Sequence, residues 1–198
     1  MGSRCSGPRG AARSALGSPP RHPELIRGLI LGSTWAWPDN RLKVRLFSAL
    51  MGGPLSPLLV DRLNLMLRLY LPLNLKRAKL TDAEGAAYEG PFPPGRRGVM
   101  RVSPREIVAG RSYLAEVEAG LPLSGKPALI LWPDSDPGFS DVELRRWQEL
   151  LPGARTVGLA RVGQFIDEDA PDDIASAVGA WWDEVVAPAG DSAARGGT

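Results

Sequence analysis

A short, wholly apolar run at residues 128–132 is the feature that most constrains the fold. It reads Ala-Leu-Ile-Leu-Trp and is closed by Pro133. A continuous apolar run of this length is typical of a strand buried on both faces of a parallel sheet. Asp134 and Asp136 follow where this strand ends. Because ligands of open α/β sheets bind beyond the carboxyl ends of the strands, both carboxylates are candidate site residues.

The remaining elements follow from the same kinds of pattern. Residues 25–32 are apolar and bounded by glycine, which predicts a second buried strand, and residues 156–159 form a short third candidate. Strands that alternate with helices predict an α/β fold, here a short parallel sheet flanked by helices. Helical periodicity or start signals predict helices at 42–51, 57–71, 81–88, 103–120, 141–151 and 172–186.

These elements divide the chain into a core and an insertion. Residues 21–40 and 122–187 contain the three strands, whereas residues 41–121 contain only helices and come between the first strand and the second. The helix at 57–71 is so apolar that we expect it to be covered on most of its circumference. Residues 1–20 are rich in Gly, Ser, Pro and Arg, and residues 188–198 in Gly and Ala, so both are predicted to be disordered.

Composition excludes several classes of protein. A chain of 198 residues with 43% hydrophobic and 23% charged residues is typical of a globular domain. Cys5 is the one cysteine, which excludes an internal disulfide and a cysteine-rich metal site and suits a cytoplasmic location. Charged residues interrupt the longest apolar region, residues 55–75, so no membrane span is expected. The sequence contains no glycine-rich phosphate loop, so no cofactor is expected. Its basic residues are not interleaved with aromatic residues, so no nucleic-acid partner is expected.

Two loop sequences carry a resemblance to a known family. Residues 132–139 read Trp-Pro-Asp-Ser-Asp-Pro-Gly-Phe, and residues 163–171 read Gly-Gln-Phe-Ile-Asp-Glu-Asp-Ala-Pro. They resemble the loops of haloalkane dehalogenases and related α/β-hydrolases that carry the catalytic acid and the catalytic histidine. Residues 29–37 and 88–93 extend the resemblance, which covers roughly residues 21 to 187. It implies a partial α/β-hydrolase fold in which residues 41–121 form a helical cap.

The resemblance assigns roles to individual residues. Such enzymes use an aspartate nucleophile, a histidine base and an acid that orients the base, with Trp or Asn side chains binding the halide. Asp136 stands in the place of the acid, and Gln164 stands in the place of the histidine. Trp35 and Trp37 follow the first strand and are candidates for the walls of an apolar pocket, although aromatic residues at a strand end are also common in cores.

Two of the family's catalytic groups have no clear counterpart. The nucleophile turn of the family reads like Gln-Asp-Trp-Gly-Gly-Pro, and the weak match at residues 3–8 puts Arg4 in the place of the aspartate and Cys5 in that of the tryptophan. The one histidine, His22, lies at the approach to the first strand, away from the expected site. An amide such as that of Gln164 has no useful proton affinity and cannot act as a general base.

The sequence therefore predicts a truncated, inactive relative of haloalkane dehalogenases, with a small apolar, haloalkane-like molecule as ligand. Two alternatives stay open. One is a non-catalytic interaction protein that uses the open sheet edge and the cap helices to bind a second copy or a partner chain. The other is a different α/β-hydrolase, such as an epoxide or ester hydrolase, because one fold hosts many chemistries.

Overall fold

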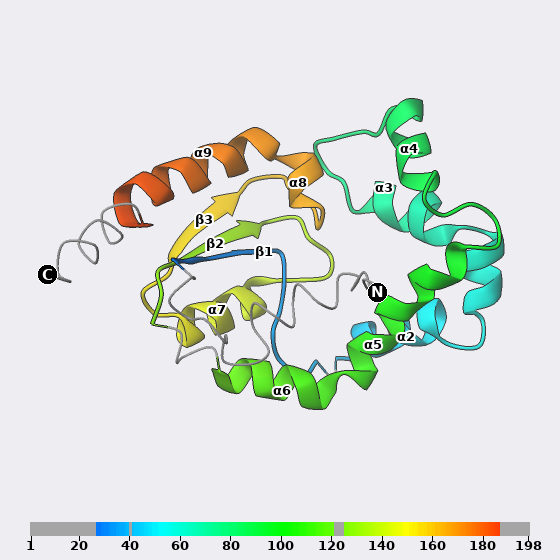
Figure 1. The fold of residues 1–198 in the computed structure, drawn as a ribbon, viewed down its shortest axis with the longest axis horizontal. Coiled ribbons are helices and arrows are strands. Elements are labelled where there is room, and N and C mark those ends of the chain that lie inside the picture. The colour runs from blue at the N-terminus through cyan, green and yellow to red at the C-terminus, as the bar shows by residue number, and fades with distance from the viewer. Residues whose placement is uncertain (1–26, 40, 121–124, 187–198) are drawn as a thin grey trace, which may run out of the picture.

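The computed structural model describes residues 27–39, 41–120 and 125–186. The segments predicted to be disordered, residues 1–20 and 188–198, lie outside this part of the chain, as do Cys5 and His22. Figure 1 shows a small sheet with helices above and below it and a larger group of helices beyond one end of the strands.

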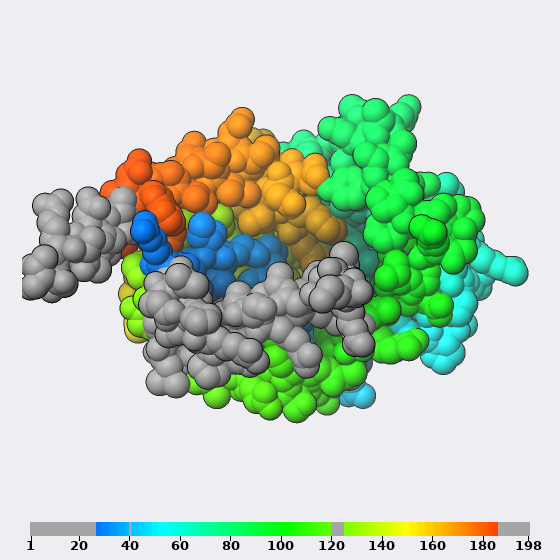
Figure 2. Space-filling model, viewed as in Figure 1, coloured from blue at the N-terminus to red at the C-terminus, as the bar shows by residue number. Residues whose placement is uncertain are grey.

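The predicted three-stranded parallel sheet is confirmed. It consists of β1 (Leu29–Gly32), β2 (Ala128–Pro133) and β3 (Arg155–Leu159), with β2 in the centre. Leu29 pairs with Ala128, and Leu129 pairs with Arg155, both in parallel register. Among the described residues β1 has no second strand beside it, and 48% of the Ile30 surface is exposed. In the space-filling view β1 lies between α9 and the helical insertion (Figure 2).

Alternate residues of β2 supply two hydrophobic clusters, one on each face of the sheet. Ile130 and Trp132 pack on the face covered by α6 (Arg111–Gly120) and α7 (Asp141–Leu150), where Trp147 is fully buried. Leu129 and Leu131 pack on the opposite face, which α9 (Pro171–Trp181) covers (Figure 1). Burial of β2 on both faces explains why its sequence is a continuous apolar run rather than an alternating one.

The insertion between β1 and β2 is helical, as predicted. Tyr113 and Val117 of α6 pack in the cluster on the sheet, so the predicted cap range 41–121 includes one helix that covers the core. The other helices lie beyond the carboxyl ends of the strands (Figure 1). They are α2 (Leu42–Gly52), η2 (Pro57–Arg62), η3 (Met66–Tyr70), α3 (Leu71–Leu73), α4 (Asp82–Glu89), η4 (Arg97–Arg101) and α5 (Val102–Ala109).

The single helix predicted at 57–71 is wrong. It is interrupted at Asn64, whose φ of +53° lies in the left-handed region, so that η2 and η3 are separate π-helical segments. Asn64 is fully buried, and its Nδ2 donates to Glu89 Oε1, while its Oδ1 has no hydrogen-bond partner among the described residues. The expected burial of this segment is only partly present. Three of its leucines are about half exposed, Leu58 48%, Leu63 48% and Leu69 47%, whereas Val60 is fully buried and Leu71 is 3% exposed.

The remaining helices fit the predictions with shifted ends. The helix predicted at 103–120 is divided at Gly110 into α5 and α6, and it begins one residue before Ser103. A capping box formed by Thr81 and Glu84 begins α4. After β3 come α8 (Ile166–Asp169), α9 and η6 (Trp182–Val186).

The side chain of Asp169 connects the insertion to the core. Its buried carboxylate accepts hydrogen bonds from the backbone amides of Lys76, Arg77, Ala78 and Gly163, at 2.7 to 3.0 Å. Burial raises the pKa of Asp169, but the four amide bonds together outweigh burial and hold this pKa below its ordinary value of 3.8. A second contact lies nearby, where the Tyr88 hydroxyl of α4 donates to Glu168 of α8. The bond to Glu168 raises the pKa of Tyr88 to about 12, so this donor stays protonated.

We expect Asp169→Asn to lower the free energy of unfolding by about 2 kcal/mol at neutral pH, because it removes the charge that strengthens four amide bonds. Since the folded pKa of Asp169 is depressed, its contribution is present above pH 3.8 and is lost as the pH falls through the folded pKa. Urea denaturation of wild type and variant at several pH values measures this. The exposed Asp183→Ala is the control, and a stability gap that stays constant down to acid pH would contradict the assignment.

Candidate functional site

Three loops meet beyond the carboxyl ends of the strands. Residues 33–39 follow β1, residues 134–140 follow β2, and residues 160–165 follow β3. The second and third loops are joined by backbone bonds from Asp134 N to Leu159 O and from Ser135 N to Val162 O, at 3.2 and 3.1 Å. The sheet thus brings together the two loops that the sequence singled out.

Asp136 is a buried carboxylate with three hydrogen-bond donors. Ser33 Oγ donates to Oδ2 at 2.5 Å, and the amides of Gly138 and Phe139 donate to Oδ1 at 2.6 and 3.2 Å. The Asp136 side chain is 9% exposed, and residues 137–139, which it holds in place, face an adjacent cavity. Asp136 is therefore placed behind the cavity wall, where it can orient other groups.

Gln164 lies close to Asp136 and in contact with the insertion. Its backbone amide donates to Asn74 O at 3.1 Å, and its side-chain Oε1 accepts from the Tyr70 hydroxyl. A methyl group in place of a Gly138 hydrogen would lie 3.0 Å from Asp136 Oδ1 and 3.8 Å from Gln164 Oε1. The structure thus places the predicted acid position and the predicted histidine position on two sides of the same glycine.

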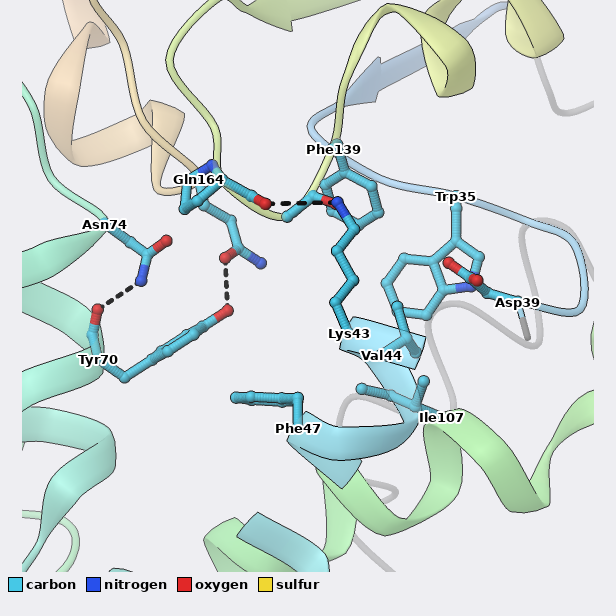
Figure 3. A pocket seen from close by; sticks show the side chains of 12 residues that line it. Trp35, Asp39, Lys43, Val44, Phe47, Tyr70, Asn74, Ile107, Phe139 and Gln164 are labelled. Atoms are coloured by element: carbon cyan, nitrogen blue, oxygen red, sulfur yellow. Dashed lines mark hydrogen bonds between the residues drawn. The ribbon is translucent and has the colours of Figure 1, made fainter. Parts of the chain in front are cut away.

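A cavity of about 230 Å³ lies between the loops and the insertion (Figure 3). Trp35 lines it, as the sequence suggested. Trp37 does not line it: this side chain is 4% exposed and packs against Trp147 in the core, with 5.2 Å between ring centroids. The cavity is lined by Trp35, Asp39, Lys43, Val44, Phe47, Tyr70, Asn74, Ile107, Pro137, Gly138, Phe139 and Gln164.

Sequence reasoning missed the polar residues that the insertion adds to this cavity. Tyr70 and Asn74 belong to no motif, and Tyr70 reaches Gln164 across 94 positions of the chain. Lys43 Nζ donates to Gly138 O at 2.8 Å, which ties α2 to the loop that holds Asp136. No sequence signal could have identified these residues, because their role depends on the fold of the insertion.

Asp39, the acidic residue that lines the cavity, is paired with an arginine, and Tyr70 is neutral. Burial raises the pKa of Asp39, but hydrogen bonds and the charge of Arg41 hold it below its ordinary value, and Arg41 also pairs with buried Glu143. Burial is the main cause that raises the pKa of Tyr70, and the charge of Asp136 adds to it against the opposing effect of Gln164. The Tyr70 hydroxyl therefore keeps its proton and acts as a donor.

Within residues 27–39, 41–120 and 125–186, no three His, Cys, Asp or Glu side chains are arranged to hold a metal ion. In the same part of the chain, no helix is both long enough and apolar enough to cross a membrane.

Comparison with known proteins relates this arrangement to a family. The chain is 33% identical over 165 residues to haloalkane dehalogenase 2 of Mycobacterium tuberculosis, a match that covers 78% of this chain and 55% of the relative. Cis-3-alkyl-4-alkyloxetan-2-one decarboxylase of Shewanella oneidensis is 28% identical over 171 residues, covering 80% of this chain and 53% of the relative. No family model matches the chain.

Solved structures agree with the sequence matches. A loop variant of the haloalkane dehalogenase DbeA from Bradyrhizobium elkanii has a TM-score of 0.74 at 21% identity, covering 88% of this chain and 63% of that one. The chain is haloalkane dehalogenase-like. Its partial α/β-hydrolase fold, predicted from the sequence, is confirmed by this structural similarity. The haloalkane dehalogenase-like chain spans about half the length of the curated relatives it matches, 55% and 53% of them.

Gly163 allows the insertion to approach the third loop of the haloalkane dehalogenase-like chain. A methyl group at this position would lie 2.0 Å from Asn74 O, far inside contact distance. We expect Gly163→Ala to lower the free energy of unfolding by about 1 to 3 kcal/mol, because the backbone of the insertion must move away. Gly158→Ala is the matched control, since nothing lies within 4 Å of a methyl group there. Equal urea midpoints for the two variants would contradict the close contact.

Proposed function

We propose that this chain, with glutamine at position 164, binds small haloalkane-like molecules in the cavity and does not hydrolyse them. The observation that carries the proposal is Gln164, which stands in the place of the family's histidine, lines the cavity and lies next to Asp136. In this proposal the helices from α2 to α5 serve as the cap over the site. An epoxide or ester hydrolase and a purely structural interaction protein are not favoured by the comparisons.

The walls of the cavity support an apolar ligand. Val44, Phe47, Ile107 and Phe139 line it, and the Trp35 ring lies tilted against that of Phe139, with 5.3 Å between the ring centroids.

The same geometry supports the absence of turnover. Hydrolysis of an alkyl-enzyme ester needs a base that takes a proton from water and a carboxylate that orients this base. Gln164 cannot take a proton, and its Oε1 already accepts from Tyr70. The carboxylate of Asp136 accepts from Ser33 and from two backbone amides, none of which can take a proton from water.

We therefore expect the purified chain to bind 1-bromohexane with 1:1 stoichiometry and to release no bromide above a heat-denatured sample. Isothermal titration measures the binding, and a halide assay measures the release. Bromide released at a steady rate would contradict the absence of turnover. No detectable binding of 1-bromohexane would contradict the proposed ligand class.

A blocked cavity provides the matched control. Val44 is half-buried in the cavity wall, and Val44→Phe adds a ring to this space. We expect this variant to lose 1-bromohexane binding while its far-ultraviolet circular dichroism stays like that of the wild type. The exposed Val142→Ser, on the outer face of α7, should leave the affinity unchanged.

A further inference from the structure

Exposed apolar side chains are concentrated in one part of the insertion. Of the twelve large hydrophobic residues that are exposed in the described part of the chain, eight are leucines between residues 42 and 73. Single exposed leucines are common on protein surfaces, whereas a group of this size marks a binding surface. In Figure 1 the cyan segments η2 and η3 lie at the end of the molecule away from the sheet, and Figure 2 shows cyan atoms projecting at that end.

One face of α2 carries three of these leucines. Leu42, Leu46 and Leu50 are four residues apart, so they lie beside one another along the helix. The buried residues of α2, Ser48 and Gly52, are on its other side, where α5 packs. A methyl group on Gly52 would lie 2.7 Å from a backbone nitrogen of α5. Helix α2 is therefore fixed to the insertion by one side and exposes an apolar stripe on the other.

The chain after α2 continues this apolar stripe. Leu58 N donates to Leu55 O at 3.1 Å, and Leu63 N donates to Leu58 O at 3.0 Å, so each of these exposed leucines is about one turn from the next. Helix α2 and η2 are in contact. We refer to the resulting set as the leucine surface, which consists of Leu42, Leu46, Leu50, Leu55, Leu58 and Leu63.

The same segment is strongly basic. Residues 41–79 contain eight Lys or Arg and one acidic residue, whereas residues 80–198 contain 11 Lys or Arg and 19 Asp or Glu. The acidic residue, Asp61, forms an ion pair with Arg101. Arg45 and Arg62 are exposed and have no carboxylate partner in the part of the chain that the structure describes. Each of them directly precedes a residue of the leucine surface, so unpaired positive charge borders the apolar side chains.

Apolar and basic groups together select one kind of partner. A second copy would bring two basic segments face to face, and like charges across an interface repel each other. A nucleic acid would pair with the arginines but would leave the leucines against phosphate or water. A bilayer that contains anionic lipid accommodates both groups, because leucines enter the boundary between headgroups and acyl chains while Lys and Arg meet the lipid phosphates.

We propose that the leucine surface binds the face of an anionic phospholipid membrane. Its leucines enter the outer part of the acyl region, and Arg45 and Arg62 meet phosphate groups beside them. A surface of this kind lies in the plane of the membrane and needs no spanning helix, which agrees with the absence of such a helix among the described residues. Membrane binding does not depend on what the cavity holds, because no leucine of this surface lines the cavity.

Co-sedimentation of the full chain with lipid vesicles tests the proposal. We expect the chain to bind vesicles of phosphatidylcholine that contain about one third phosphatidylglycerol, and to bind pure phosphatidylcholine about tenfold more weakly. Sodium chloride at about 0.5 M should weaken binding to the anionic vesicles, because it screens the arginines from the lipid phosphates.

Two variants separate the apolar contribution from the charged one. Leu46→Gln/Leu50→Gln/Leu58→Gln removes apolar groups that are already exposed, and we expect it to weaken binding to anionic vesicles about tenfold or more. Arg45→Gln/Arg62→Gln should weaken the same binding about tenfold and leave binding to pure phosphatidylcholine unchanged. Circular dichroism confirms that each variant is folded.

A matched control changes the same kinds of side chain elsewhere. Val142 and Arg145 are exposed on α7, and Val142→Ser/Arg145→Gln should bind vesicles like the wild type. A wild-type chain that does not bind anionic vesicles would overturn the proposal, and equal binding to the two kinds of vesicle would overturn the choice of anionic lipid. Sedimentation velocity provides a second measurement. A wild-type dimer that the leucine variant abolishes, without any vesicle binding, would assign the surface to a second copy instead.

Discussion

A buried carboxylate with four backbone amides around it determines how the two parts of this molecule meet. Asp169 belongs to the core, and Lys76, Arg77 and Ala78 belong to the insertion. Because amides and carboxylate are shielded from water, each bond depends on the others being present. The hydrogen bond from Gln164 N to Asn74 O is a further contact between the core and the insertion. Without this contact the cavity would lose one of its walls.

In the function that we propose, the site has the placement of a hydrolase site and the chemistry of a binding site. Loops after parallel strands meet at one edge of the sheet, which is where catalytic groups of such folds are found. At this edge, however, the group in the place of the base is the side-chain amide of Gln164, which accepts a hydrogen bond from Tyr70, while the backbone amide of Gln164 donates to Asn74 O. Replacing a proton acceptor with an amide removes the capacity of this position to take a proton from water.

The elements and the two loops could be predicted from the sequence because their signals are local. The strand at 128–132, the capping box at Thr81 and the loop carrying Asp136 each depend on neighbouring residues. The interruption at Asn64 could not be predicted in this way. Its left-handed backbone is stabilised by burial and by a bond to Glu89, which is 25 positions away.

The sequence by itself determined the α/β class, the order of the strands along the chain and the amide at position 164, because these follow from apolar periodicity and from motifs. Tertiary structure alone decided which side chains surround the cavity. Trp35 faces the cavity and Trp37 faces the core, although two positions separate them, and Tyr70 and Asn74 reach Gln164 from a distant segment. The physical reason is that a cavity is defined by the packing of separate elements, and packing depends on contacts that local sequence patterns do not contain.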